Sequence, residues 1–166
     1  MTFEREPMPP NPASGTHTRP WVLKLAYPKL PLTLNDRRHR MVIWREQRNL
    51  RDSVRYLAQH AGIPRLDGVH VVMHWTPMTV RARDADNAVA TLKSAIDGLR
   101  DYPARYRNVK AHGRTALTLA TPAWRGVVPD DTPEHVTWTP PKIHPADPNP
   151  HLTERLVLYV YEGTRE

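Results

Sequence analysis

The chain contains no cysteine among its 166 residues. Disulfides, thiolate zinc sites and thiol nucleophiles are therefore excluded, and the composition suits a reducing compartment. Long apolar runs are also missing, since no stretch approaches the roughly 20 residues of a membrane-spanning helix. The first six residues carry two acids and one base without an apolar segment of the signal-peptide kind. The sequence therefore predicts neither membrane insertion nor secretion.

Negative charge is scarce relative to positive charge. The chain has 24 Lys and Arg against 17 Asp and Glu, a formal net charge of +7, and a pI of about 10.0. Such a balance favours a polyanionic partner such as nucleic acid, although a merely soluble basic surface is the alternative. At roughly 100 to 200 residues per domain, the length predicts one domain.

Proline is abundant, with 18 residues, about twice the usual ~5%. One proline cluster lies in residues 1–20, which we interpret as a flexible tail preceding a single domain over 21–166. A second cluster, in residues 140–150, predicts a stiff loop inside that domain.

Hydrophobic periodicity predicts the elements of this domain. Apolar residues alternate over 21–27 and 69–75, which is typical of half-buried strands. Steps of three and four residues predict a helix from after Asp36 to about Gly62, and a second helix spans 85–99. Residues 135–139 and 156–161 resemble a hairpin joined by the proline-rich loop. We therefore expect an α+β (α/β) fold with a small mixed sheet and two main helices.

Acidic residues cluster where the strand over 69–75 gives way to the second helix. Asp84 and Asp86 are separated by one residue, and Asp130 and Asp131 follow the apolar pair Val127-Val128. If the two strands are neighbours, these carboxylates converge, and charges 4 Å apart repel by about 4 kcal/mol at an effective dielectric near 20. Mg²⁺ or Mn²⁺ would remove that penalty. The alternative is that Asp84 or Asp86 caps the helix and that Asp130-Asp131 opens a turn.

The second helix carries a polar stripe. Asp86, Ala90, Lys93 and Asp97 follow one another at steps of four, three and four residues, so they share one face. Lys93 would then face the same cleft as Asp86, where a cation can stabilise charge on a phosphate. A surface ion pair between Lys93 and Asp97 is the alternative. His70 and His74 share a strand face, where we expect core-edge or surface side chains rather than metal ligands.

In order along the chain, these motifs resemble those of the RusA family of Holliday junction resolvases, which are crossover junction endodeoxyribonucleases common in phages and prophages. The resemblance rests on Asp84-x-Asp86-Asn87, a lysine followed by Asp97-Gly98-Leu99, Val127-Val128-x-Asp130-Asp131 and the upstream Pro31-x-x-x-Asn35. It spans roughly residues 25–136.

The resemblance implies a RusA-like fold and a metal site for Mg²⁺, or Mn²⁺ as a substitute. Asp84, Asp86 and Asp131 would hold the metal and carry catalysis, with Asp130 as an additional ligand, and no organic cofactor is expected. Lys93 is the candidate catalytic lysine; the usual family spacing, four residues after the second aspartate, falls on Ala90 here.

The family's activity implies a homodimer that resolves four-way DNA junctions by paired symmetric nicks that leave a 5′-phosphate. Its role would lie in DNA recombination and repair, in the cytoplasm of a bacterium or of a phage-infected host. Two further hypotheses stay open: a catalytically inactive module that binds branched DNA, and a metal-dependent hydrolase of small phosphate esters.

A basic insertion over about 100–126 replaces the much shorter turn of the family. Its basic and aromatic side chains suit phosphates and exposed bases, although an ordinary solvated loop is the alternative. The candidate DNA-binding residues of the whole chain are Asn35, Arg37, Arg38, Arg40, Arg45, Arg48, Arg83, Arg105, Arg107 and Lys110.

Overall fold

The computed structural model describes residues 19–79 and 85–163. Nearly all of the predicted tail, and the candidate site residues Arg83 and Asp84, lie outside these ranges.

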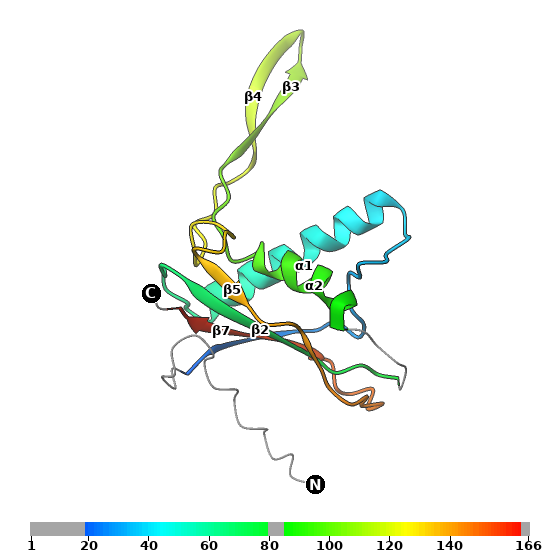
Figure 1. Cartoon of the computed structure of the whole chain (residues 1–166). Helices are drawn as coiled ribbons and strands as arrows, with labels where there is room; N and C mark the ends of the chain where they lie inside the picture. Colours follow the sequence, from blue (N-terminus) through cyan, green and yellow to red (C-terminus); the bar gives the residue numbers. More distant parts are fainter. Residues whose placement is uncertain (1–18, 80–84, 164–166) are drawn as a thin grey trace.

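Over the described residues, five strands form one mixed sheet (Figure 1). They are β1 (Trp21–Leu25), β2 (Val69–Trp75), β5 (Val136–Trp138), β6 (Lys142–Ile143) and β7 (Leu156–Glu162). The order is β1-β7-β2-β5, and β6 pairs with β2 on the same side as β5. β7 runs antiparallel to both of its neighbours, whereas β5 and β6 run parallel to β2. The predicted α+β class with a small mixed sheet is confirmed.

The predicted hairpin between residues 135–139 and 156–161 is wrong. Both segments are strands, but β2 lies between them, with β5 on one edge and β7 on the other. The proline-rich loop is long enough to pass around the end of β2. β5 and β7 therefore keep the opposite directions of a hairpin without pairing.

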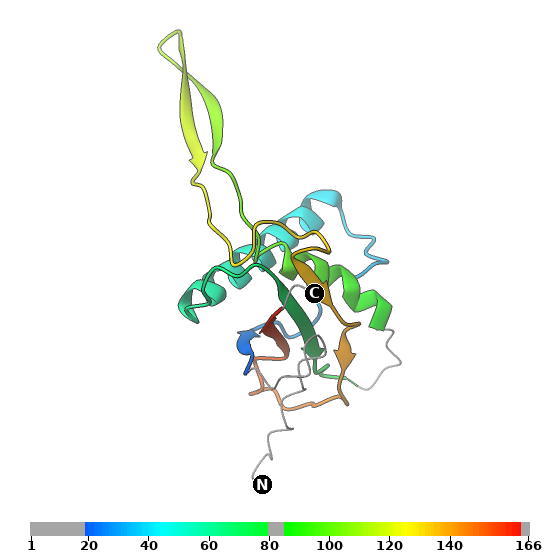
Figure 2. The ribbon, with the colours of Figure 1, turned by 60° about the vertical axis from the view of Figure 1, so that its left-hand side comes forward.

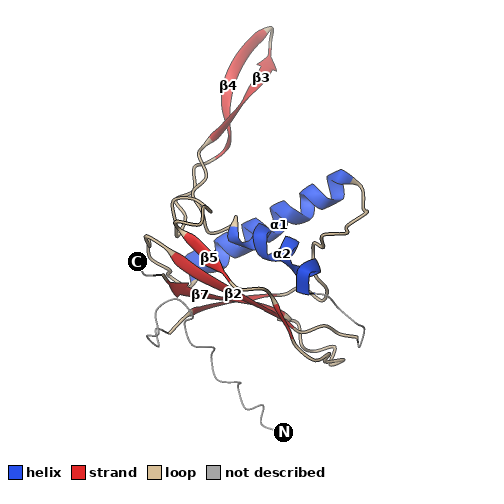
Figure 3. Ribbon diagram, viewed as in Figure 1, coloured by secondary structure: helices blue, strands red, loops and turns tan. Residues whose placement is uncertain are grey.

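Two helices cover one face of the sheet in the described part of the chain, as Figure 3 shows: α1 (Arg40–His60) and α2 (Ala85–Ile96). Alternate residues of β2 point into the core beneath them, and Leu50, Val54 and Ala58 of α1 follow at four-residue steps. Gly98, two residues after α2, packs directly against α1, since a Cβ there would lie 2.8 Å from the Arg51 carbonyl oxygen. Burial of these apolar faces fixes the end of α2 against α1.

The basic insertion contains a hairpin, made of β3 (Arg105–Ala111) and β4 (Arg114–Thr121). We call residues 105–121 the arm and the rest of the described chain the body. His112 and Gly113 form the turn with φ of 51° and 74°, which is typical of the two-residue turns that favour glycine and match the strand twist. The arm projects away from the body (Figure 2).

Neither described helix combines the length and the apolar character needed to cross a membrane.

Candidate functional site

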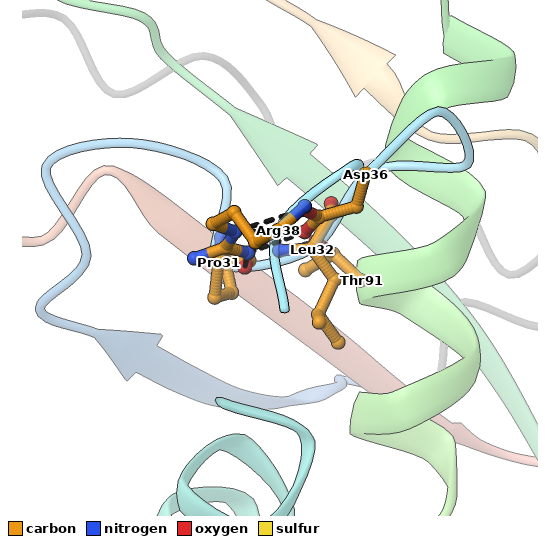
Figure 4. A network of polar contacts seen from close by, with 5 residues as sticks. All are labelled: Pro31, Leu32, Asp36, Arg38 and Thr91. Atoms are coloured by element: carbon orange, nitrogen blue, oxygen red, sulfur yellow. Dashed lines mark hydrogen bonds and ion pairs between the residues drawn. The ribbon is translucent and has the colours of Figure 1, made fainter. Parts of the chain in front are cut away.

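The segment that precedes α1 packs on the first turns of α2. Thr91 Oγ1 donates a hydrogen bond to the Leu32 carbonyl at 2.7 Å and accepts one from the Leu32 amide at 3.3 Å (Figure 4). Asn35 Nδ2 donates to Asn87 Oδ1 at 3.2 Å. The proline-and-asparagine motif therefore meets the acidic motif at the start of α2, next to Asp86.

Arg38 holds this segment in shape. Its guanidinium donates to the Pro31 carbonyl at 2.6 Å and forms a bidentate contact with the Asp36 carboxylate (Figure 4). Hydrogen bonding from Arg38 lowers the pKa of Asp36. Arg38, Arg37 and Arg40 are all exposed, but the guanidinium of Arg38 is engaged within the loop.

The polar stripe predicted for the second helix is confirmed. Asp86 lies in the first turn of α2, and Asp86 and Lys93 are exposed. The Asp97 amide donates to the Lys93 carbonyl at 3.0 Å, so helical geometry continues to Asp97. Because seven and eleven residues correspond to nearly whole numbers of turns, these three side chains lie along one line, with Ala90 between them. Asp97 lies 3.5 Å from Arg100 Nε, as an ion pair at the end of the stripe.

The segment that carries Asp131 docks on the carboxyl end of α2. The amides of Val127 and Val128 donate to the Leu99 carbonyl at 2.7 and 3.2 Å. Asp131 then lies 3.6 Å from Arg100 Nε. Burial raises the pKa of Asp97; Arg100 opposes this rise, and the nearby Asp131 carboxylate adds to it. Asp97, Asp131 and Arg100 therefore form one charged cluster at this end of the helix.

Asp130 has a different role from its neighbour. Its Oδ1 accepts hydrogen bonds from the Thr132 amide at 3.1 Å and the Thr132 hydroxyl at 2.6 Å. The Thr132 hydrogen bonds lower the pKa of Asp130. This is the turn that the sequence offered as the alternative interpretation of Asp130-Asp131.

Asp86 and Asp131 lie at opposite ends of α2. The eleven residues from Asp86 to Asp97 rise about 16 Å along a helix, and Asp131 is beside Asp97. Ligands of one Mg²⁺ lie about 2.1 Å from the ion, so a single described chain does not bring these two carboxylates onto one ion. The sequence made convergence conditional on neighbouring strands, and Val127 and Val128 pair instead with Leu99 and Arg100 just after α2. That condition is therefore not met for Asp86 and Asp131 within one chain.

The described residues contain no group of three or more metal-ligating side chains. His70 Nδ1 lies 2.8 Å from Thr137 Oγ1, and His144 Nε2 lies 3.0 Å from His74 Nδ1. Both predicted strand histidines are thus in polar contacts of the sheet, and burial lowers the pKa of His70.

The other basic candidates in the described ranges fall into two groups. Arg45 and Arg48 are exposed on α1, where Arg48 lies 3.8 Å from Asp52 and 5.7 Å from the centre of the Trp44 ring. Arg105, Arg107 and Lys110 are exposed on the arm.

Aromatic side chains anchor the root of the arm. Tyr102 and Trp124 exchange backbone hydrogen bonds of 2.9 and 2.8 Å. Two guanidiniums contact the Tyr102 ring: that of Arg55 lies 4.8 Å and that of Arg100 4.6 Å from the ring centre. Arg55 also contacts the Trp124 ring at 5.5 Å. Sequence reasoning grouped Tyr102 and Trp124 with base-stacking residues and missed this anchoring role.

A second set of contacts also holds the root together. Arg65 forms an ion pair with Asp101 and donates to the Gly126 carbonyl at 3.0 Å, while the Gly126 amide donates to Asp101 Oδ1 at 2.7 Å. A Cβ at Gly126 would lie 2.3 Å from the Leu99 carbonyl oxygen. Only glycine allows the 126–131 segment this close to α2.

Sequence reasoning also missed Thr91. The available signal was a hydroxyl within the apolar face formed by Ala88, Leu92 and Ala95, because a fully buried hydroxyl needs a hydrogen-bond partner.

Comparison with known proteins finds no matching family model, and no curated protein or solved structure gives a significant match.

Proposed function

We propose that the chain is a Mg²⁺-dependent endodeoxyribonuclease that cuts four-way or other branched DNA by paired nicks, acting as a homodimer. The observation that supports it best is the contact of Asn35 with Asn87. It joins two separate motifs of the RusA resemblance beside Asp86, at the start of a helix that carries a third motif at its end.

The donor set suits the ion. Asp84, Asp86 and Asp131 offer only carboxylate oxygens, the ligands that Mg²⁺ prefers and that Mn²⁺ accepts. The ion would supply Lewis acidity at the scissile phosphate. Among this chain's residues, Lys93 lies about 10 Å along the helix from Asp86, exposed on the same stripe. A long ammonium side chain there can hold a DNA phosphate and neutralise its charge.

The distance between Asp86 and Asp131 favours a site shared by two chains. A two-fold axis across α2 would place the start of one helix beside the end of the other, and the partner's Asp131 would then approach Asp86. The same operation creates a second, equivalent site, as two nicks in opposed strands require.

The first test is cleavage of a synthetic mobile four-way junction beside a matched linear duplex, with Mg²⁺ or with EDTA. The wild type should give paired, Mg²⁺-dependent nicks in the junction. Asp86→Ala should lower the nicking rate at least about 100-fold and leave junction binding intact. Asp67→Ala, which changes an exposed acid on a loop before β2, is the matched control and should cut normally. Undiminished nicking by Asp86→Ala would contradict the assignment.

A catalytically inactive module for branched DNA is the second candidate. It is favoured by the separation of Asp86 from Asp131 in one chain and by the shift of the lysine from the Ala90 position to Lys93. Tight junction binding without nicking, in either Mg²⁺ or Mn²⁺, would support it over the nuclease.

A further inference from the structure

We propose that the arm is a DNA-gripping β-ribbon that lies along the groove of one duplex arm of the branched substrate, away from the phosphate that is cut. This inference rests on the DNA partner of the proposed function, but not on catalysis.

Charge is the first reason. Between Asp101 and Asp130 the sequence holds no acid and five basic residues, so this segment supplies five of the seven net positive charges of the chain. The basic residues are Arg105, Arg107, Lys110, Arg114 and Arg125. The remainder of the chain is close to neutral, so the affinity for a polyanion is concentrated on the arm and its root.

Shape is the second reason. Strands of seven and eight residues at about 3.3 Å per residue give a ribbon roughly 23 Å long. The major groove of duplex DNA, about 12 Å wide, admits a two-stranded ribbon. The side chains of β4 from Arg114 to Ala120 are exposed, and the arm stands clear of the body (Figure 2). Its reach corresponds to about seven base pairs.

The strand register assigns the side chains to two faces. Tyr106 pairs with Leu119, Asn108 with Leu117, and Lys110 with Thr115, so these six residues share one face. That face combines apolar groups with an amide, an ammonium and a hydroxyl, which are groups that contact base edges and thymine methyls. Arg107 and Arg114 lie on the opposite face, and their long side chains can pass the ribbon edges to reach flanking phosphates.

The apolar side chains of the arm are exposed, which indicates that a binding partner covers them. Tyr106, Leu117 and Leu119 are 58%, 68% and 50% exposed. A second copy of the arm is a poor occupant, because each arm is cationic and carries no acid to pair with the other. DNA satisfies both the apolar and the cationic groups.

The contacts at the root fix the position of the arm relative to the body. The Tyr102–Trp124 hydrogen bonds and the stacking of Arg55 and Arg100 on Tyr102 hold the ribbon where it leaves the body. Arg100 also contacts Asp131. DNA held by the arm is therefore positioned relative to a candidate metal ligand.

The test measures affinity for four-way junctions whose duplex arms are shortened stepwise from about 20 to about 6 base pairs, the arm's reach being about seven. The wild type should bind short-armed junctions at least tenfold more weakly than long-armed ones. A variant with residues 105–121 replaced by Asn-Gly should bind long-armed junctions at least tenfold more weakly than the wild type and respond little to duplex length. Equal affinity of this variant and the wild type at every length would overturn the inference.

A second variant avoids any doubt about folding. Arg107→Gln, Lys110→Gln and Arg114→Gln together change only exposed side chains. If Arg107 and Arg114 each neutralise one phosphate, the slope of log affinity against log salt should become shallower by about 1.8, or by about 2.7 if Lys110 neutralises a third. Arg19→Gln with Lys29→Gln changes two exposed cations of the body that are not among the candidate DNA-binding residues. This double variant is the control and should leave the dependence on duplex length in place. An unchanged slope in the triple variant would overturn the inference.

Two further readouts separate the inference from its rivals. At saturating protein concentration, the arm-deleted variant should still nick the junction, whereas Asp86→Ala should not. This result would show that the arm contributes to DNA binding and Asp86 to catalysis. A wild type that binds through the arm but does not nick would reject the nuclease and leave the inference intact. Sedimentation covers the other occupant: if Leu117→Thr with Leu119→Thr halves the mass and leaves DNA affinity unchanged, the arm joins two chains and the inference is wrong.

Discussion

Single residues set the geometry of the candidate site at its two ends. At the start of α2, Thr91 and Asn87 hold the Leu32 and Asn35 segment. At the other end, Gly126 lets the chain pass against the Leu99 carbonyl. Neither contact involves a charged side chain. The contact at Asn87 lies next to Asp86, and the close approach at Gly126 places the segment that carries Asp131.

Gly126→Ala should lower the free energy of unfolding by about 3 kcal/mol or more, because the new Cβ would overlap the Leu99 and Arg100 backbone, which cannot move away as a side-chain end can. Urea unfolding measures the change. Gly68→Ala is the control, since a Cβ there meets nothing closer than 3.5 Å; its stability should be unchanged or raised by about 0.4–1 kcal/mol. If Gly126→Ala and Gly68→Ala lowered the free energy of unfolding equally, the Gly126 position would not be as crowded as the structure indicates.

The individual roles of the acids could be predicted only in part. The spacing of Asp86, Lys93 and Asp97 predicted their common face, because helical geometry is local. Asp131 depended on a long-range pairing: the apolar pair Val127-Val128 predicted a strand but could not show that its partner is the Leu99–Arg100 turn.

At the scale of elements, the strand over 69–75 and both helices were predicted close to their observed bounds, because the apolar residues of each recur at a regular spacing. The half-burial expected for 69–75 was wrong: His70 and Val72 are buried as well, so β2 is covered on both faces. β5 and β6 were harder, since strands of three and two residues offer too few positions to show alternation. The hairpin of the arm had a signal, the His112-Gly113 turn between alternating residues, but the sequence analysis used only the basic and aromatic composition of the insertion and predicted no strands there.

The proline-rich loop over 140–150 is fastened by one buried side chain. Arg155 is 2% exposed, and its guanidinium donates to the carbonyls of Asp147 at 2.7 Å, of Asn149 and of Thr76. The loop is thereby tied to the end of β2. A buried guanidinium tolerates this setting because carbonyl oxygens replace its water.

Arg155→Met should lower the free energy of unfolding by about 1–3 kcal/mol, because it leaves buried carbonyl oxygens without donors. Lys24→Met is the control: Lys24 forms an exposed ion pair with Glu154, the neighbour of Arg155, and its loss should change stability by less than about 1 kcal/mol. Thermal or urea unfolding distinguishes the two. If Arg155→Met is as stable as the control, the guanidinium does not fasten the loop.

At the scale of the whole molecule, the shared site predicts complementation between two inactive variants. If Asp86 of one chain works with the partner's Asp131, a mixed dimer of Asp86→Ala and Asp131→Ala chains has one site with both carboxylates and one with neither. Equal coexpression gives mixed dimers in about half of the population, so about a quarter of wild-type site activity should return. Nicking of the junction measures it, and the nicks should be single, not paired.

Each variant alone is the control for this mixture and should be inactive. If both carboxylates belonged to one chain, every site in the mixed dimer would lack one of them. A mixture as inactive as its components, beside an active wild type, would therefore reject the shared site.

The root of the arm has an evolutionary consequence. Because Tyr102 and Trp124 are hydrogen-bonded to each other, the chain leaves the body and re-enters it at adjacent points. Segments that begin and end side by side can be lengthened, shortened or exchanged without moving what lies on either side. A chain built this way can acquire a new binding preference by replacing one hairpin, while the sheet, both helices and their acidic residues keep their places.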